Sequence, residues 1–494
     1  MTYVVASLVE RSIAGVSDSS KKAFRLGADL VEVRLDRLTS AKLTPGTIQR
    51  VRGAIRGPAI ATLRSAAEGG GSSIKGAART EALREVLGAG FEFVDLELRT
   101  DRRLLAAGVP GSGRPKVIVS SHFRKPVDRA TLSDRLTEAC EAGDIGKVAM
   151  PCEDAGQAIG LAETGLAFSR RGEQFTLIGM GEQGQLTRAC ARKIGSSMAY
   201  ACLPGREAAP GQLDVQAQCA MLGGDRLLLG LVGHPVSHSV SKPMQEAAMT
   251  KEGIPGRYLH LDIPPEGFDR NAVAVLRRLG FDGLNITIPH KTKAFELCDE
   301  HAPSAAATGA VNTLSFRGGS VCGENTDSFG FSKLIEGKIR IGKHRSALVI
   351  GAGGAARAAA HVLSRSGIDV SIAARHLGKA EEVASMTGTR AVAFASLGKD
   401  GPGYDIVVNC TPIGMKGFKA GTVPARAFGR GTVFFDMVYN PPVTATMRAA
   451  RSKGARAYGG LDMLVNQGAE AFRIWTGRRP DVAAMRRAAR RALA

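Results

Sequence analysis

The N-terminal part of the chain repeats one pattern eight times, a short β-rich run followed by a helical stretch. The predicted strands are residues 3–8, 30–35, 59–64, 91–98, 116–121, 147–150, 175–180 and 197–202. Eight such units within about 220 residues are what a (β/α)8 barrel requires. A doubly wound open sheet is the alternative, but no glycine-rich phosphate-binding turn follows any of the eight runs. We therefore predict a (β/α)8 barrel over residues 1–222.

A different β/α rhythm begins near residue 227, and a chain of 494 residues is in any case too long for a single core. Residues 346–357 read SALVIGAGGAAR, a predicted strand that runs into a GxGxxA turn and then a helix. Glycines in such a turn let a pyrophosphate approach the helix N-terminus closely. The bare motif is weak evidence, but its strand–turn–helix context is right. We therefore predict a dinucleotide-binding domain of Rossmann type in the second half of the chain.

The end of the next predicted strand indicates which dinucleotide binds. That strand ends at Ala374, and Arg375 stands 24 residues after Gly351 (375 − 351). An acidic residue at this place would bind a ribose 2′-hydroxyl and select NAD, whereas an arginine suits a 2′-phosphate. Lys379 adds positive charge nearby. The sequence therefore predicts NADP as the cofactor.

Reactive side chains gather at the strand ends of the predicted barrel. Lys147 lies near the start of the sixth strand and His122 just past the end of the fifth. The remaining candidates at strand ends and in later loops are Glu32, Arg34, Arg64, Glu68, Arg188 and Gln212. Each residue taken singly is more often structural, with Glu32 and Arg34 forming a simple ion pair. Their joint placement at the mouth of a barrel favours an active site.

A lysine amine attacks a ketone only when it is unprotonated, and an ordinary lysine has a pKa of about 10.4. We expect burial and nearby arginines to lower the pKa of Lys147 by about three units, at a cost of roughly 4 kcal/mol against the ammonium form. The same arginines suit a carboxylate substrate, because a guanidinium binds a carboxylate through two parallel hydrogen bonds.

A second polar set lies between residues 283 and 327. In GLNITIPHK (283–291), alternation places Thr287 on the polar side of a strand with Lys291 at its exit. Asn312 and Asp327 follow in two polar turns, and Ser239 and Ser241 precede a probable helix. A lysine paired with a carboxylate could transfer a proton to or from a ring oxygen as hydride moves. The alternative is that the asparagines merely cap turns.

The first 220 residues carry the motifs EVRLD (32–36), TLRSAAEGG (62–70), SSHF (120–123), GKVAMP (146–151), GMGEQGQLTR (179–188) and APGQ (209–212). In this combination they resemble the type I 3-dehydroquinate dehydratases. The resemblance implies that Lys147 forms an imine with the substrate ketone, while His122, oriented by Glu68, removes a proton and helps to expel water. It further implies that Arg188 holds the carboxylate and that Glu32, Arg34, Arg64 and Gln212 place the hydroxyls and the carbinolamine. Ala208 stands where that family usually has a serine, which predicts weaker closure over the substrate.

Residues 228–480 resemble the shikimate dehydrogenases through HSVS, NITIPHK, GAVNT, NTD, GAGGAAR, VNCTPIGM, FDMVYNPP and GGLDMLVNQG. The resemblance implies an α/β substrate-binding domain over residues 223–330, completed by the helices of residues 462–494, and a Rossmann domain over residues 331–461. It also implies that Lys291 and Asp327 are the catalytic pair. It places Ser239, Ser241, Thr287, Asn312, Tyr439 and Gln467 around the substrate, and Gly351, Gly353, Gly354, Ala355, Arg375, Thr411 and Gly460 around the cofactor. Family members often read Asn-Arg-Thr where this chain reads Ala374-Arg375-His376, so the arginine is kept while two neutral hydrogen-bonding groups differ.

Composition argues against nucleic-acid binding, a zinc site and a membrane span. The net charge of +20 could indicate nucleic-acid binding, but aromatic residues make up only 5% and the arginines are spread along the chain. A general field that favours anionic substrates is the better interpretation. The eight cysteines show no CxxC pair and no zinc-type spacing, so we expect no metal site. No apolar run of membrane-spanning length and no targeting segment is visible, which favours the cytoplasm.

Together these features predict a bifunctional enzyme of aromatic amino acid biosynthesis. One site would dehydrate 3-dehydroquinate to 3-dehydroshikimate through a lysine imine, and the other would reduce 3-dehydroshikimate to shikimate with NADPH. Because one product is the next substrate, the fusion makes chemical sense. The alternatives are an NAD-dependent quinate/shikimate dehydrogenase, a regulatory protein that binds metabolites without turnover, and a nucleic-acid-binding protein. We expect small-molecule partners only, and the sequence does not indicate an oligomeric state.

Overall fold

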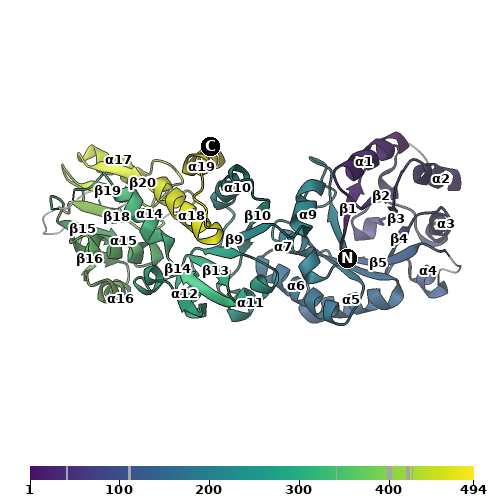
Figure 1. Cartoon of the computed structure of the whole chain (residues 1–494), viewed down its shortest axis with the longest axis horizontal. Helices are drawn as coiled ribbons and strands as arrows, with labels where there is room; N and C mark the ends of the chain where they lie inside the picture. Colours follow the sequence, from purple (N-terminus) through teal and green to yellow (C-terminus); the bar gives the residue numbers. More distant parts are fainter. Residues whose placement is uncertain (40–42, 109–112, 341, 398–402, 419–422, 425–426) are drawn as a thin grey trace. The chain divides into compact units, whose positions relative to one another are not determined.

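The computed structural model describes residues 1–39, 43–108, 113–340, 342–397, 403–418, 423–424 and 427–494 (Figure 1). The chain divides into two compact units, Met1–Arg226 with Leu259–Gly280, and Leu227–Tyr258 with Phe281–Ala494. Its strands form one eight-stranded and two six-stranded sheets. Among the described residues, no helix is long and apolar enough to cross a membrane.

The eight-stranded sheet is the predicted barrel, with strand order β7-β6-β5-β4-β3-β2-β1-β8 and β7 in contact with β8 at its two ends. Its strands are β1 (Tyr3–Leu8), β2 (Leu30–Arg34), β3 (Ala59–Thr62), β4 (Phe93–Glu97), β5 (Lys116–His122), β6 (Ile145–Pro151), β7 (Phe175–Met180) and β8 (Met198–Ala201). The helices between and after them are α1 (Ile13–Arg25), α2 (Pro45–Gly53), α3 (Gly76–Leu87), α4 (Arg102–Ala107), α5 (Arg129–Ala142), α6 (Ala155–Arg170), α7 (Gln185–Ala189), α8 (Ala191–Ile194) and α9 (Val215–Leu222). All eight predicted strands are present, so the predicted barrel fold is confirmed.

Strand alternation explains how the barrel builds a polar site above an apolar floor. Leu30, Ile60, Phe93, Ile118 and Ile145 pack together inside the barrel. Two residues further along the same strands, the side chains facing the same way are Glu32, Thr62, Asp95, Ser120 and Lys147. The intervening residues, such as Val31, Val33, Val94 and Val119, pack in a separate core with the surrounding helices. Because side chains alternate between the two faces of a strand, these five strands carry an apolar residue and then a polar one on their inner face.

The first six-stranded sheet has the order β10-β9-β11-β13-β14-β12. Its strands are β9 (Leu227–Gly233), β10 (Gly256–Asp262), β11 (Gly283–Ile286), β12 (Glu300–His301), β13 (Thr313–Arg317) and β14 (Ser320–Glu324). The connecting helices are α10 (Ser241–Lys251), α11 (Arg270–Arg278), α12 (Lys291–Leu297) and α13 (Pro303–Ala306), and α14 (Thr326–Ile335) follows the sheet. β11 pairs in parallel with β9 and antiparallel with β13, so the sheet is mixed.

The second six-stranded sheet is parallel throughout, with the order β17-β16-β15-β18-β19-β20. Its elements are β15 (Ser346–Ile350), α15 (Gly354–Arg365), β16 (Asp369–Ala374), α16 (Leu377–Thr387), β17 (Arg390–Ala393), β18 (Ile406–Asn409), β19 (Val433–Asp436), α17 (Ala445–Ser452) and β20 (Arg456–Gly459). Numbered along the chain, this order is 3-2-1-4-5-6, the Rossmann arrangement, with the reversal of direction between β15 and β18. The predicted Rossmann fold is therefore confirmed.

The last two helices are α18 (Leu461–Thr476) and α19 (Val482–Leu493). α18 packs against α14 and α10, and α19 packs against α10 and α18. Gly330 of α14 makes the close approach to α18 possible, because an added Cβ would lie 2.7 Å from the carbonyl oxygen of Met463. These contacts bring Gln467 of α18 to the turns that carry Asn312 and Asp327.

Two candidate active sites

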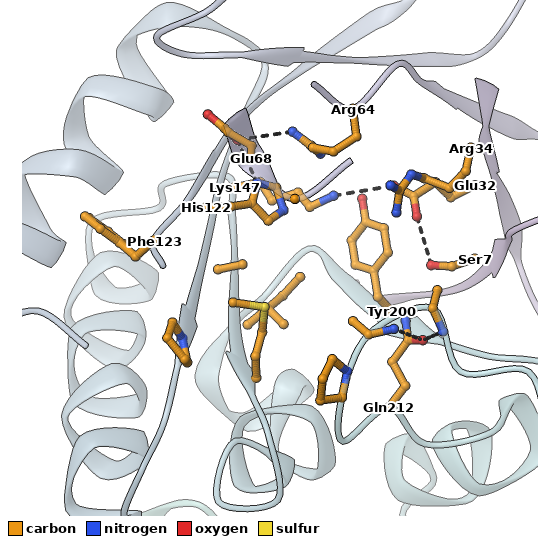
Figure 2. Close-up of a pocket in the computed structure, with 18 of the residues that line it drawn as sticks. Ser7, Glu32, Arg34, Arg64, Glu68, His122, Phe123, Lys147, Tyr200 and Gln212 are labelled. Atoms are coloured by element: carbon orange, nitrogen blue, oxygen red, sulfur yellow. Dashed lines mark hydrogen bonds and ion pairs between the residues drawn. The ribbon is translucent and has the colours of Figure 1, made fainter. Parts of the chain in front are cut away.

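A cavity of about 520 Å³ opens at the carboxyl ends of the barrel strands (Figure 2). It is lined by all eight residues predicted for the dehydratase site, which are Glu32, Arg34, Arg64, Glu68, His122, Lys147, Arg188 and Gln212. Ser7, Tyr200 and Ala208 also line it. The barrel thus brings together every side chain that we predicted for this site from the sequence.

Lys147 lies deeper than expected, as the third residue of β6 and only 3% exposed. Its Nζ atom is 3.0 Å from Oδ2 of Asp95 and 3.6 Å from Oε1 of Glu32, and it lies 4.0 Å from the centre of the Tyr200 ring. In Figure 2 its side chain extends from the strand toward Glu32. Lys147 thus lies near the start of its strand, as predicted, whereas Glu32 lies in the middle of β2 and not after it, so its predicted place is wrong. They belong to the inner layer of the barrel.

The predicted lowering of the lysine pKa is also wrong for this state of the site. Burial favours the neutral amine, but Asp95, Tyr200 and Glu32 outweigh it and raise the pKa of Lys147 above its ordinary value. The nearest charges are carboxylates rather than the arginines that we expected. Lys147 therefore rests as an ammonium ion held by two buried carboxylates.

Asp95 is the functional residue that sequence reasoning missed. It lies on β4, its side chain is 0% exposed, and its Oδ1 accepts hydrogen bonds from Ser120 Oγ at 2.6 Å and from Arg64 at 3.0 Å. Burial alone would raise the pKa of Asp95, but Arg64 and Lys147 hold it well below its usual range. A signal was present in the predicted strand FEFVDLEL, because Asp95 and Glu97 lie on the same face as Phe91 and Phe93. Acidic residues at that spacing in a barrel strand point inward.

The two arginines of the second and third strands are held by protein carboxylates. Arg34 binds Asp36 through two hydrogen bonds of 2.8 and 2.9 Å, which replaces the simple Glu32–Arg34 pair. Glu32 instead accepts hydrogen bonds from Ser7 at 2.8 Å and from Thr62 at 2.9 Å. The guanidinium of Arg64 contacts carboxyl oxygens of three residues, Asp95, Glu68 and Glu97. Arg64 therefore links the partner of the lysine to the partner of the histidine.

His122 ends β5, and its Nδ1 atom is 2.8 Å from Oε2 of Glu68, which follows β3 in a short 3₁₀ turn. Burial raises the pKa of Glu68 to about 8. Burial, together with Arg64 and Lys147, lowers the pKa of His122 well below its ordinary value. The imidazole is thus neutral at neutral pH, as a general base must be.

Arg188 is a buried cation with no carboxylate partner. It lies in α7 at 4% exposure, and one guanidinium nitrogen donates to the carbonyl of Tyr200 at 3.0 Å. Among the described residues, no carboxylate forms an ion pair with it, and its Nε atom has no hydrogen-bond partner. Burial lowers its pKa to about 10, so it remains charged at neutral pH. A charged group that lines a cavity in this state suits an anionic ligand.

The loop that follows β8 is folded over Gln212. The side-chain oxygen of Gln212 accepts hydrogen bonds from the backbone N–H groups of Ala208 at 2.8 Å and Ala209 at 3.2 Å. Ala208 lines the cavity but brings no hydroxyl to it. The expected loss of a polar contact at this position therefore agrees with its placement.

In the second unit, Lys291 begins α12 and forms an ion pair with Asp327 of α14. The side-chain amide of Asn312 donates to Asp327 at 2.9 Å and to the oxygen of Gln467 at 3.2 Å. The alternative that the asparagines merely cap turns holds for Asn325, which caps α14, but not for Asn312. Four of the predicted residues therefore form one connected polar cluster.

The other predicted substrate residues lie near the start of α10 and after β11. Ser239 donates to Ser241 at 3.1 Å, and Tyr439 hydrogen-bonds Ser239 while burial raises the pKa of its phenol. Thr287 follows β11, and its methyl group would lie 2.3 Å from a Cβ added at Gly233. The structure thus joins Tyr439 to the serines across 200 residues of sequence (439 − 239).

The glycine-rich turn after β15 fits a dinucleotide. Gly351 has a φ of +118°, and a Cβ at Gly354 would lie 2.7 Å from Cδ of Lys291. A Cβ at Gly460 would lie 2.2 Å from the carbonyl oxygen of Met437, and Thr411 follows β18 with its hydroxyl donating to Asn409 at 2.6 Å. Gly353 caps α15, which Gly354 and Ala355 begin. The turn therefore contacts the predicted catalytic lysine directly.

The strand end beyond this turn supplies positive charge. Arg375 follows β16, and Arg375 and Lys379 are both exposed. Neither forms an ion pair within the part of the chain that the structure describes. These residues fit the 2′-phosphate of NADP. The described residues contain no group of three or more His, Cys, Asp or Glu side chains that could hold a metal ion.

Comparisons with known proteins match both halves of the chain to the families that their sequences resemble. The family model of type I 3-dehydroquinase matches residues 4–222. Models of the shikimate dehydrogenase substrate binding domain, of shikimate/quinate 5-dehydrogenase and of the shikimate 5′-dehydrogenase C-terminal domain match residues 231–314, 334–452 and 460–490. The chain is 30% identical to the chloroplastic bifunctional 3-dehydroquinate dehydratase/shikimate dehydrogenase of Arabidopsis thaliana, over 96% of this chain and 82% of the plant protein. The chain belongs to this bifunctional family.

Single-function relatives of the dehydrogenase half are closer in sequence. The NADP(+) shikimate dehydrogenase of Archaeoglobus fulgidus is 42% identical over 54% of this chain and 99% of its own length. The crystal structure of shikimate 5-dehydrogenase from Thermus thermophilus, in complex with NADP(H) and shikimate, is 38% identical with a TM-score of 0.50. The match covers 54% of this chain and all of that one. The dehydrogenase half of this chain therefore spans essentially the full length of these single-function relatives.

Proposed function

We propose that the protein catalyses two consecutive steps of the shikimate pathway, dehydration of 3-dehydroquinate to 3-dehydroshikimate and NADPH-dependent reduction of 3-dehydroshikimate to shikimate. The observation that carries this proposal is the pairing of two different lysine sites in one chain. Lys147 lies in the barrel cavity beside a neutral His122, whereas Lys291 is paired with Asp327 against a dinucleotide-binding turn. The first arrangement suits a covalent imine and the second suits proton transfer.

In the barrel, the unpaired guanidinium of Arg188 binds the substrate carboxylate. Lys147 attacks the ketone, and the resulting iminium withdraws electrons from the adjacent C–H bond. His122 removes that proton and then protonates the departing hydroxyl, while Glu68 fixes which ring nitrogen carries the hydrogen. Glu32 and Gln212, with Arg34 and Arg64, place the ring hydroxyls along the cavity wall.

In the dehydrogenase half, NADPH supplies the hydride when it is bound. Lys291 and Asp327 move the proton at the ring oxygen whose carbon is reduced. Asn312, Gln467 and Thr287 hold the neighbouring hydroxyls. Ser239, Ser241 and Tyr439 bind the carboxylate end of the ring. The residues that would hold the cofactor are Gly351, Gly353, Gly354 and Ala355 at the pyrophosphate and Arg375 at the 2′-phosphate, with Thr411 and Gly460 completing its site.

The remaining sequence predictions belong to the same proposal. The functional boundaries are the dehydratase barrel at 1–222, the substrate-binding domain at 223–330 with 462–494, and the Rossmann domain at 331–461. The partners are small-molecule substrates, with no nucleic acid or membrane among them, and the protein acts in the cytoplasm.

A coupled assay tests the proposal. 3-Dehydroquinate and NADPH together should cause NADPH oxidation at 340 nm, and each alone should not. Lys147→Met should abolish the signal from 3-dehydroquinate while leaving the signal from 3-dehydroshikimate intact. Absence of NADPH oxidation with 3-dehydroshikimate would refute the dehydrogenase assignment. Two comparisons of kcat/KM, NADPH against NADH and shikimate against quinate, distinguish the proposed NADP-dependent shikimate dehydrogenase from an NAD-dependent quinate dehydrogenase.

A further inference from the structure

The short turn that carries Glu68 gains little stability from packing. It is the 3₁₀ turn Ala66–Glu68, and none of its residues is buried. The side chains of Ala66 and Ala67 are exposed, so they remove little apolar surface from water. The turn must nevertheless keep a carboxyl oxygen of Glu68 at 2.8 Å from Nδ1 of His122. Polar contacts to the backbone of the turn therefore have to fix its position.

Arg124 supplies contacts of this kind. Its Nε atom donates to the carbonyl of Ala67 at 3.0 Å. Its Nη2 atom donates to the carbonyls of Ala66 at 2.9 Å and of Ala67 at 2.8 Å. Carbonyls at the end of a helical turn need donors from outside the turn. One guanidinium reaches two successive carbonyls because its N–H groups form a planar fork of fixed geometry.

The loop that carries Arg124 is itself anchored to the barrel. Arg124 stands two residues after His122, in the segment that follows β5. Between them, the backbone N–H of Phe123 donates to the carbonyl of Ala149 on β6 at 2.9 Å. The guanidinium carbon of Arg135 on α5 lies 5.0 Å from the centre of the Phe123 ring. Arg124 therefore connects an anchored loop to a turn that has little packing of its own.

We propose that Arg124 is a positioning residue of the dehydratase, which holds the turn Ala66–Glu68 against the loop after β5 and so keeps Glu68 on Nδ1 of His122. This inference rests on the proposed function of the barrel. The carbonyl of Ala67 and the backbone nitrogen of Glu68 belong to one planar peptide group. A guanidinium that fixes this carbonyl therefore restricts where the side chain of Glu68 begins. Small displacements of a catalytic group are costly, since about 1 Å can reduce a rate about 100-fold.

The alternative is that Arg124 binds the substrate directly. It is exposed and lines the cavity, so its charge could attract a carboxylate. However, Nε and Nη2, an edge that could bind a carboxylate through two parallel hydrogen bonds, already contact the carbonyls of the turn. Arg188 lines the same cavity, and among the described residues its Nε atom has no hydrogen-bond partner. The contacts therefore favour Arg188 for the carboxylate and Arg124 for the turn.

Arg124→Met separates the two roles by steady-state kinetics with 3-dehydroquinate, followed by enone absorbance. We expect kcat to fall about tenfold because the histidine is less well oriented, a part of the roughly 100-fold or more that a positioned acid–base group contributes. The KM should stay within about twofold of the wild type, since no substrate contact is removed. A kcat equal to that of the wild type would overturn the inference. A raised KM with unchanged kcat would make Arg124 a substrate-binding residue and overturn it as well.

A double-mutant cycle with Glu68→Ala tests whether Arg124 acts through Glu68. In the Glu68→Ala background, Arg124→Met should lower kcat by less than about twofold, because no carboxyl remains to be positioned. A general structural role would instead lower kcat by the same factor in both backgrounds. Equal losses in the two backgrounds would thus contradict the proposed role.

Lys125→Met is the matched control. Lys125 is the next residue in the same loop, is also exposed, and is not among the residues that line the cavity. Its replacement removes the same charge, and kcat should stay within about twofold of the wild type. An equal loss in both variants would assign the effect to the positive charge of the loop and refute the role of Arg124.

The dehydrogenase activity of the same chain reports whether each variant has folded. It should be unchanged in Arg124→Met, since the replaced side chain is exposed and belongs to the barrel. If the wild-type chain reduces 3-dehydroshikimate but does not dehydrate 3-dehydroquinate, the proposed function of the barrel fails. If it dehydrates 3-dehydroquinate and Arg124→Met does so equally well, only the present inference fails.

Discussion

The two lysine sites of this chain differ in what surrounds the amine. Lys147 lies on a strand inside the barrel at 3% exposure and touches two carboxylates of other strands. Lys291 begins a helix, its side chain is 15% exposed, and it has one carboxylate partner. The first lysine is enclosed by a network that includes Arg64, while the second faces the cofactor turn at Gly354.

This difference suits the chemistry that we propose for each lysine. A covalent intermediate must be protected from water and must keep a charged nitrogen in a buried place, so the barrel provides fixed counter-charges. A proton donor at a hydride-transfer site needs one partner and access to the place where substrate and cofactor meet. In the proposed mechanisms, the same residue type therefore serves two kinds of chemistry because its environment differs.

Removal of the amine of Lys147 should have the largest effect and should affect only one of the two sites. Lys147→Met should lower the dehydratase kcat by at least about 10⁴-fold, because no other amine in the cavity can form the imine. Dehydrogenase activity with 3-dehydroshikimate should remain within twofold of the wild type. The two activities are measured on one preparation by enone absorbance and NADPH oxidation. A dehydratase that survives would show that the lysine is not covalent.

Removal of the second lysine should have a large but smaller effect. Lys291→Met should lower the kcat of the dehydrogenase about 10³-fold, since the proton transfer is lost while the hydride donor remains bound. Its KM for NADPH should change little, and dehydratase activity serves as the internal control. A loss that appears only in KM would instead make Lys291 a binding residue.

Replacement of the unpaired arginine tests substrate binding in the barrel. Arg188→Met should raise the KM for 3-dehydroquinate about 100-fold, since a buried carboxylate would lose its charged partner. The imine should still form at saturating substrate, as shown by borohydride trapping on Lys147. If KM stays unchanged, the carboxylate binds elsewhere in the cavity.

Replacement of Arg375 in the dehydrogenase half should have a smaller effect, on the choice between NADPH and NADH. Arg375→Met should raise the KM for NADPH about 30-fold, the value of a lost charge-assisted hydrogen bond, and leave the KM for NADH unchanged. Lys379→Met is the matched control and should have a weaker effect in the same direction. Equal effects on NADPH and NADH would contradict a contact with the 2′-phosphate.

The smallest expected effect is a pH dependence that only the barrel should show. As pH rises through about 8, the pKa of Glu68, this carboxyl loses its proton and can accept Nδ1–H of His122. Nε2 is then free to act as a base, so the dehydratase kcat/KM should rise about tenfold between pH 7 and 9. Glu68→Gln should remove the rise, because an amide does not titrate in this range. A rise that persists in the variant would assign the titration to another group.

Much of the site could be predicted because its signals are local. Strand alternation and the spacing of eight β/α units indicate a barrel, and the turn at Gly351 indicates a dinucleotide site. Lys147, His122, Lys291 and Asp327 each stand in a distinctive short motif. The ion pair of Lys291 with Asp327 could be guessed, since only 36 residues separate them.

The partners of Lys147 could not be predicted in the same way. Asp95 lies 52 residues away on β4, and the two meet only because β4 and β6 are both aligned in register with β5 inside the barrel. Likewise Gln467 reaches Asn312 across 155 residues, through the packing of α18 on α14. We expected arginines around the lysine because they were numerous, and the register placed carboxylates there instead.

The sequence by itself determined the two folds, the cofactor type and the reactive side chains, because periodicity, turn chemistry and residue type act over short distances along the chain. Only the tertiary structure decided the charge of the barrel lysine and the partners that hold it. A pKa depends on which groups surround an atom in space, and in a closed barrel those groups come from strands far apart in sequence.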